Sequence, residues 1–253
     1  MRHIMNQYLS SAELKAAAKE HMFGKYGVAI AALVIVFLIE GCCTLLISSL
    51  TDTTTIPGTV VYYLLSFVMA VIFGIFSSGM AYFYLKVACG YPVSVSDIFY
   101  GFKLCPDKAL IIQAWTGILS YLFMLPNIVL TYQFTKATTG ANIDVSAYSS
   151  LMLPYSLSMI LMSVASIIIS LFYAQSFYLL HDFPQYSAKE LLAMSRHIMK
   201  GQKGRLLYLY ISFLPLFLLS LLSCGIALLW LTPYINATLA EFFLDIMRKG
   251  NSY

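Results

Sequence analysis

The sequence has 253 residues, of which 60% are hydrophobic and 10% charged, with a formal net charge of +4 and a mean hydropathy of +0.81. A water-soluble domain has about 45–50% apolar and about 25% charged residues, so this composition excludes a soluble globular protein. The apolar residues form blocks longer than the roughly 18 residues that indicate a membrane span. We therefore expect residues 1–253 to form a single all-α, polytopic membrane domain.

An amphipathic helix is predicted over residues 10–24. Ser10 and Glu13 form an S-x-x-E capping box, in which both side chains satisfy free N–H groups at a helix start, and Gly24 can end the helix. Such a helix is typical of a cytoplasmic membrane surface, with apolar residues such as Leu14 and Met22 turned toward lipid. Membrane lipids are accordingly the first expected partner.

Hydropathy predicts six membrane spans, paired as three hairpins. Their approximate bounds are residues 28–50, 59–85, 109–133, 151–180, 206–222 and 226–247. The first four are each long enough to cross about 30 Å of hydrocarbon. The last two depend on a tight turn at Ser223–Gly225. The alternative is one span from Leu206 to Leu231, which gives five spans and places the C-terminus outside.

The distribution of basic residues favours the six-span arrangement. Of the fifteen lysines and arginines, Lys136 is the only one in the loops on the side opposite to both termini. Because cytoplasmic loops are enriched in Lys and Arg, the other side is expected to be cytoplasmic. The sequence thus predicts a multi-pass protein of a bacterial cytoplasmic membrane with both termini in the cytoplasm.

A shift of 177 residues aligns the predicted N-terminal helix with a second one over residues 187–200. Ser10 and Glu13 align with Ser187 and Glu190, and both copies precede a span. Leu191, Met194 and Ile198 are expected to face lipid. A weaker counterpart lies between them, where Ser96 or Asp97 would cap a short helix. Either the chain repeats one plan three times, or helices on a cytoplasmic leaflet simply look alike.

Glu40 is the candidate site residue, because it lies inside the first predicted span. Ionisable residues within spans are expensive and are functional hypotheses by default. Glu40 could be paired structurally with Gln113, Gln175, Asn127 or a serine, or it could relay protons or ions through a central cavity. We therefore assign Glu40, Gln113 and Gln175 to a candidate intramembrane polar site.

No catalytic, cofactor or metal site is predicted. His3, His21, His181 and His197 lack metal-ligand spacing and are expected to be surface residues. The five cysteines also lack such spacing and are expected to pack without further chemistry. The dispersed basic residues are explained by topology, so no nucleic acid is expected as a partner.

Two C-terminal stretches support a resemblance to a known family. They read HDFPQYSAKELLAMSRHIMKGQKGRLLYLYISF and SCGIALLWLTPYINATLAEFF, and the opening SSAELKAAAKEHMFGKYGVAI fits as well. Together they resemble the bacterial membrane family called domain of unknown function 975, which is similar in plan to the membrane domain of some glycerophosphodiester phosphodiesterases. The resemblance implies a membrane fold and location, and it implies no catalytic residues.

We therefore expect a non-enzymatic membrane module that interacts with lipids or with a protein partner at its cytoplasmic face. The alternative is a small transporter or permease-like protein that uses Glu40 in a central cavity. An enzyme would require at least two converging catalytic groups at similar depth, and the sequence offers no such pair.

Overall fold

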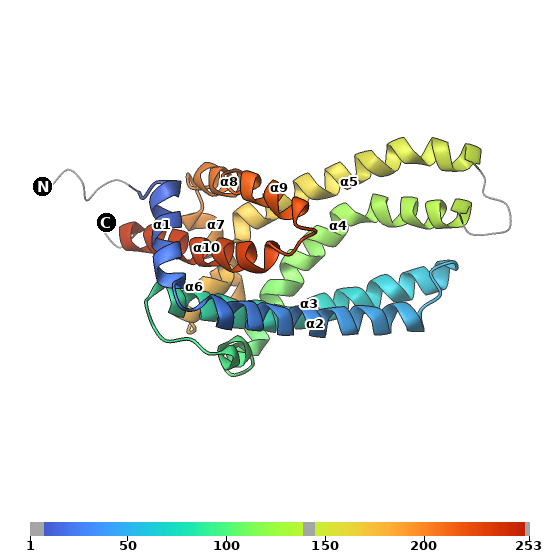
Figure 1. The fold of residues 1–253 in the computed structure, drawn as a ribbon. Coiled ribbons are helices and arrows are strands. Elements are labelled where there is room, and N and C mark those ends of the chain that lie inside the picture. The colour runs from blue at the N-terminus through green and yellow to red at the C-terminus, as the bar shows by residue number, and fades with distance from the viewer. Residues whose placement is uncertain (1–7, 139–144, 251–253) are drawn as a thin grey trace, which may run out of the picture. The chain divides into compact units, whose positions relative to one another are not determined.

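The computed structural model describes residues 8–138 and 145–250, which form helices joined by turns and contain no strand (Figure 1). The α-helices are α1 (Ser11–Met22), α2 (Tyr26–Leu50), α3 (Ile56–Ala88), α4 (Pro106–Thr138), α5 (Val145–Tyr173), α6 (Ser176–Asp182), α7 (Ala188–Ile198), α8 (Lys203–Ile211), α9 (Leu214–Leu222) and α10 (Leu228–Gly250), and η1 (Val95–Phe102) is a 3-10 helix. His3 lies outside the described residues.

Five helical segments of the described part are long and apolar enough to cross a membrane. They are Tyr26–Leu50, Ile56–Ala88, Pro106–Ala137, Ser149–Asp182 and Lys203–Leu222. These segments agree with the first five predicted spans, although short breaks separate α5 from α6 and α8 from α9. The chain therefore has the all-helical, apolar character of a multi-pass membrane protein.

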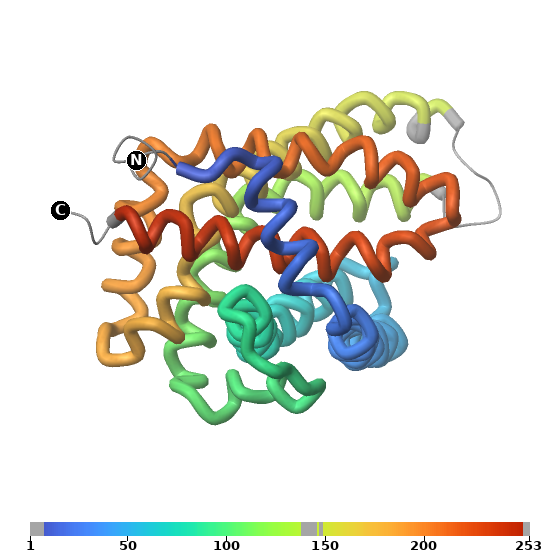
Figure 2. The backbone as a smooth tube through the Cα atoms, turned by 60° about the vertical axis from the view of Figure 1, so that its left-hand side comes forward, coloured from blue at the N-terminus to red at the C-terminus, as the bar shows by residue number. Residues whose placement is uncertain are grey.

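The sixth predicted span is present as helix α10 but is not confirmed as a span. Polar and charged residues, including Glu241 and Asp245, interrupt its apolar sequence, so α10 is absent from the apolar segments found in the described part. The predicted turn before it does form, with positive φ angles of 51° at Cys224 and 84° at Gly225. After this turn, α10 runs back beside α9 (Figure 2).

The helices form two compact units. Unit 1 contains residues 1–38, 75–109 and 171–253, and unit 2 contains residues 39–74 and 110–170. Unit 2 is thus built from one end of each of the long helices α2, α3, α4 and α5. Unit 1 holds their other ends together with α1, η1 and helices α6 to α10.

Helix α1 packs against α10 within unit 1 (Figure 2). Leu14 is 2% exposed and Met22 is fully buried, and Leu14 joins a core cluster with Phe242 and Ile246 of α10. Leu191 of α7 is also fully buried. The expectation that these side chains face lipid is therefore wrong, because an amphipathic pattern is satisfied equally well by protein packing.

Helix η1 lies against α3 at two close backbone contacts. A Cβ atom on Gly79 would lie 1.7 Å from the carbonyl oxygen of Ile98, and one on Gly101 would lie 2.1 Å from that of Ile75. Neither contact leaves room for a side chain. Gly79 of the second predicted span thus allows close packing of α3 against η1.

The two predicted capping boxes are confirmed. The Ser10 N–H donates to Glu13 Oε2 at 2.7 Å, and the Ser187 N–H donates to Glu190 Oε2 at 2.8 Å. The prediction for the third, weaker helix is wrong about its capping residue. Ser94 precedes η1 as its N-cap, and neither Ser96 nor Asp97 has that position. Asp97 instead accepts a hydrogen bond from the Ser94 N–H at 2.8 Å and pairs with Lys86 at 2.9 Å.

Candidate functional site

Glu40 lies on α2 in unit 2, with its side chain exposed. Phe37, one turn before Glu40, is an exposed apolar side chain on the same side of the helix, whereas the exposed Leu38, Leu45 and Leu46 point to other sides. Ten residues separate Glu40 from the end of α2 at Leu50, which corresponds to about 15 Å along the helix. A charged side chain near the centre of a bilayer costs about 2.5–3.5 kcal/mol, so this carboxylate requires a compensating contact.

The chain does not supply that contact among its described residues. The Glu40 side chain makes no hydrogen bond or ion pair in residues 8–138 and 145–250, and only its backbone carbonyl is engaged, by the Thr44 hydroxyl at 2.9 Å. Asn127, one of the expected partners, instead donates to Ser158 at 3.1 Å. This buried bond joins α4 to α5 within unit 2.

The other two predicted site residues have separate environments. Gln113 is half-buried on α4 in unit 2, whereas Gln175 is 1% exposed at the start of α6 in unit 1. Both polar atoms of the Gln175 amide are buried without a hydrogen-bond partner in the described structure. No hydrogen bond joins Glu40 to Gln113 within the described part of unit 2, and Gln175 belongs to unit 1, so a polar site made of these three residues stays a prediction.

The sequence interpretation missed a half-buried histidine. His181 Nε2 donates to the carbonyl oxygen of Ser78 at 2.7 Å, and its ring lies 5.3 Å from that of Tyr82. Tyr82 in turn stacks on Tyr100 of η1 at 4.0 Å. His181 therefore links α6 to α3 and η1, and the expectation of a surface histidine is wrong at this position. Its partner is 103 residues away, beyond the reach of local patterns.

Two acidic residues of α10 were also missed. Glu241 and Asp245 are each 5% exposed and lie one turn apart. Glu241 Oε1 is 2.6 Å from His21 Nδ1 of α1, and Asp245 Oδ2 is 2.7 Å from Arg205 Nη2 of α8. We call these two pairs the α10 ion pairs. Each buried carboxylate lies beside a basic side chain, so the two pairs connect α1 and α8 to α10 and give Glu241 and Asp245 a structural role.

No group of three or more His, Cys, Asp or Glu side chains that could hold a metal ion occurs in the described part of the chain. Glu40 lies within a membrane-length helix, and its position demands a contact that the described residues do not make. The middle of α2 is therefore the candidate functional surface.

Comparison with known proteins agrees with the sequence resemblance. Residues 5–250 match the family described as "Protein of unknown function (DUF975)". No curated protein and no solved structure matches the chain. Since the match covers both the capped helices and all the apolar segments described above, the chain belongs to the DUF975 family.

Proposed function

We propose that this chain is a non-enzymatic, multi-pass protein of a bacterial cytoplasmic membrane that assembles with another membrane-spanning protein. The contact surface is the part of α2 around Glu40. The observation that carries this proposal is the exposed Glu40 carboxylate in the middle of an apolar, membrane-length helix. Polar side chains within a bilayer promote helix association, because the alternative is an unsatisfied polar group in hydrocarbon.

Charge complementarity indicates a partner helix that carries Lys or Arg at the same depth. Every lysine and arginine in the five apolar segments lies within two residues of a segment end. A second copy of this chain would therefore bring no cation to the level of Glu40. Lipid headgroups are also about 15 Å away, so a basic side chain from a different protein is the best match.

The proposed topology rests on the distribution of lysine and arginine residues between the two sides of the membrane. We propose six spans with both termini in the cytoplasm, as the positive-inside distribution suggests. The reversal at Cys224 and Gly225 supports this arrangement, because it returns α10 toward the side from which α8 begins. The α10 ion pairs support it too, since each of the two buried acids of that helix lies beside a basic side chain. Basic residues on the cytoplasmic side would also contact anionic lipids.

A transporter in which Glu40 faces a central cavity finds less support. Its carboxylate would have to point into a polar cavity, whereas the Glu40 side chain is exposed beside the exposed Phe37. Intramembrane carboxylates in transport pathways face a bundle interior or a water-filled cavity. The partner surface therefore accounts better for the position of Glu40.

The test uses synthetic membrane-spanning helices of leucine and alanine as probes. The full chain, labelled with a donor dye, is reconstituted in vesicles with acceptor-labelled probes that carry Lys, Leu or Glu at the centre. Energy transfer should report association about tenfold stronger for the Lys probe than for the Leu probe, equivalent to about 1.4 kcal/mol. The preference should vanish in Glu40→Gln.

Thr44→Val is the matched control, because Thr44 lies one turn from Glu40 and its hydroxyl already donates to the helix backbone. This variant should keep the preference for the Lys probe. Equal association of the wild-type chain with the Lys and Leu probes would refute the proposal. Transport activity lost in Glu40→Gln but kept in Thr44→Val would favour the transporter instead.

A further inference from the structure

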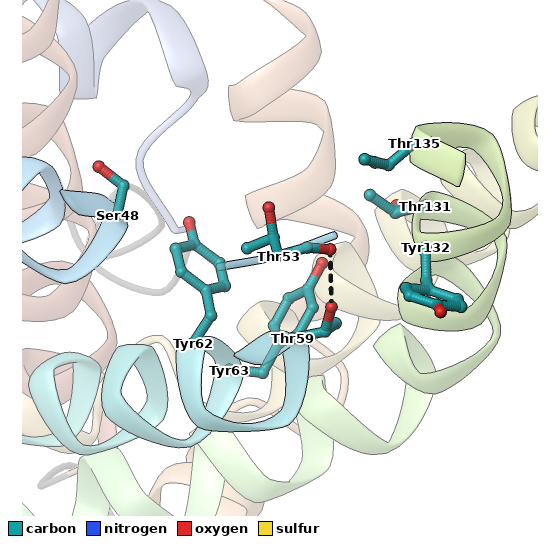
Figure 3. A pocket seen from close by; sticks show the side chains of 8 residues that line it. All are labelled: Ser48, Thr53, Thr59, Tyr62, Tyr63, Thr131, Tyr132 and Thr135. Carbon is teal, nitrogen blue, oxygen red and sulfur yellow. Dashed lines mark hydrogen bonds between the residues drawn. The ribbon is translucent and has the colours of Figure 1, made fainter. Parts of the chain in front are cut away.

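A cavity of about 310 Å³ lies in unit 2, beside the turn that joins α2 to α3 (Figure 3). Its walls come from Ser48 of α2, from the turn, from α3 and from α4, all of which belong to unit 2. Small-molecule sites generally measure about 300–1,000 Å³, so this cavity has room for one compact ligand group.

All eight lining residues that the structure describes carry a hydroxyl group. They are one serine, four threonines and three tyrosines, and none of these eight is charged. Figure 3 shows Tyr62 and Tyr63 rising from α3, with Thr131 and Thr135 pointing toward them from α4. A lining of this kind offers aromatic rings and neutral hydrogen-bonding groups together.

The wall formed by the turn is fixed by hydrogen bonds and close packing. The buried Thr59 hydroxyl donates to the carbonyl oxygens of Thr53 at 3.0 Å and Thr55 at 2.9 Å. A Cβ atom on Gly58 would lie 1.9 Å from the carbonyl oxygen of Asp52, so the turn closes tightly there. The cavity therefore has a preformed edge rather than a loose loop.

The wall formed by α4 is supported from behind. Thr131 Oγ1 lies 3.4 Å from Asn127 Oδ1, and Asn127 donates to Ser158 of α5 at 3.1 Å. Asn127 and Ser158 are both buried. This polar contact fixes α4 against α5 one turn below the cavity and so restrains the position of Thr131.

The lining combines hydrogen-bond acceptors with available donors. Ser48 and Thr59 donate their hydroxyl protons to backbone carbonyls, so toward a ligand their oxygens act as acceptors. The hydroxyls of Tyr62 and Tyr132 make no hydrogen bond within residues 8–138 and 145–250 and can donate to a ligand. A bound group should therefore both donate and accept, which describes an alcohol better than an amine or an anion.

The geometry points to a binding site for a neutral, polyhydroxylated group such as a sugar or cyclitol ring. Such a ring presents alternating hydroxyl donors and acceptors to the lining, and its C–H faces can pack on tyrosine rings. None of the lining residues that the structure describes is charged, which disfavours phosphate, carboxylate and ammonium groups because these would enter without a counter-charge from them. This site is distinct from the proposed contact surface around Glu40.

Two sources could present the same chemistry. Ser48 and Thr59 lie near the ends of their apolar segments, at Leu50 and Ile56, where membrane helices meet lipid headgroups. The ring could thus belong to a glycolipid headgroup or to a free sugar in solution. The experiment uses D-glucose and glucosyl diacylglycerol, which share one headgroup and differ in the lipid anchor.

The full chain is purified in a detergent without a sugar headgroup, because a maltoside would compete for the site. Binding of D-glucose is measured by saturation-transfer NMR, and binding of glucosyl diacylglycerol by native mass spectrometry, with diacylglycerol lacking the sugar as reference. Tyr62→Phe and Tyr132→Phe each remove one donor and keep the ring, so each should weaken binding about five- to tenfold. An unchanged unfolding midpoint shows that these variants fold.

Tyr121→Phe is the matched control, because Tyr121 lies on α4 with Tyr132 but its ring packs on Phe67 and it does not line the cavity. This variant should bind as the wild type does. Binding of both probes would identify a site for the sugar itself, and binding of the glycolipid alone would identify a headgroup site. The proposal is overturned if D-glucose gives no saturation-transfer signal and glucosyl diacylglycerol does not exceed the diacylglycerol reference, or if Tyr62→Phe and Tyr132→Phe bind as tightly as Tyr121→Phe.

Discussion

Asp245 Oδ2 lies 2.7 Å from Arg205 Nη2, and both residues also hold the backbone of Leu9. The Leu9 N–H donates to the Asp245 carboxylate at 3.3 Å, and Arg205 Nη2 donates to the Leu9 carbonyl at 2.9 Å. One ion pair thus connects α8 and α10 with Leu9, which lies two residues before the start of α1. This arrangement assigns Asp245 a structural role that its short distance to an arginine alone would not reveal.

Asp245→Asn should destabilise unit 1. The change removes the charge opposite Arg205 and weakens the acceptor for Leu9, so we expect a loss of about 1–3 kcal/mol, less than for a fully buried pair because Arg205 is 27% exposed. The measurement is the unfolding midpoint in detergent. Glu20→Gln, on the exposed side of α1, is the control and should leave the midpoint unchanged.

Gly79→Ala should be strongly destabilising, because the added methyl group would overlap the backbone of Ile98 at 1.7 Å. Overpacking usually costs about 1–3 kcal/mol, and a backbone clash belongs at the upper end of that range. Gly27→Ala is the matched control, since it lies in helix α2 with no atom within 4 Å of the new Cβ. Equal unfolding midpoints for the two variants would show that η1 does not contact α3 at Gly79.

The cap of α7 should lose its contribution to stability in acid. Hydrogen bonds from the Ser187 backbone and side chain lower the pKa of Glu190 below its ordinary value of 4.5. A lowered pKa in the folded state means that the stabilisation is present above 4.5 and is lost as the pH falls through the lowered value. Unfolding midpoints across this pH range should fall more steeply for the wild type than for Glu190→Gln. Parallel curves would contradict the cap.

Cysteine accessibility tests the proposed topology. In a background without native cysteines, Thr54→Cys should react with a membrane-impermeant reagent added outside the cell, because its turn joins two spans on the proposed outer side. Asn251→Cys should react only after the membrane is opened. Labelling of Asn251→Cys in intact cells would eliminate the six-span arrangement and restore the five-span alternative.

Features with a local signal were predictable from the sequence. Apolar length alone located the long helices α2, α3 and α4, and the spacing of Ser187 and Glu190 was sufficient to predict a capping box. Both signals depend on residues close together in the chain. The same locality explains why the turn at Cys224 and Gly225 could be expected from short, small residues between two apolar blocks.

Features that depend on distant partners were not predictable. The face of α1 that carries Leu14 has the same pattern whether it meets lipid or α10, and only the fold distinguishes the two. His181 and Ser78 are 103 residues apart. The candidate site residues depend on both local and distant determinants. The cost of placing Glu40 in a span could be inferred from the neighbouring sequence, whereas the separate environments of Gln113 and Gln175 could not.

The contact between α1 and α10 also sets an order of events during synthesis. Leu9 and Asp245 are separated by 236 residues, and synthesis proceeds at about 5–20 residues per second. The ribosome thus completes α10 roughly 10–50 s after α1 has been made. Until then Leu14 lacks Phe242 and Ile246, two members of the cluster that covers it in the folded protein. The packing of α1 is completed only by a helix whose Asp245 follows Leu9 by 236 residues.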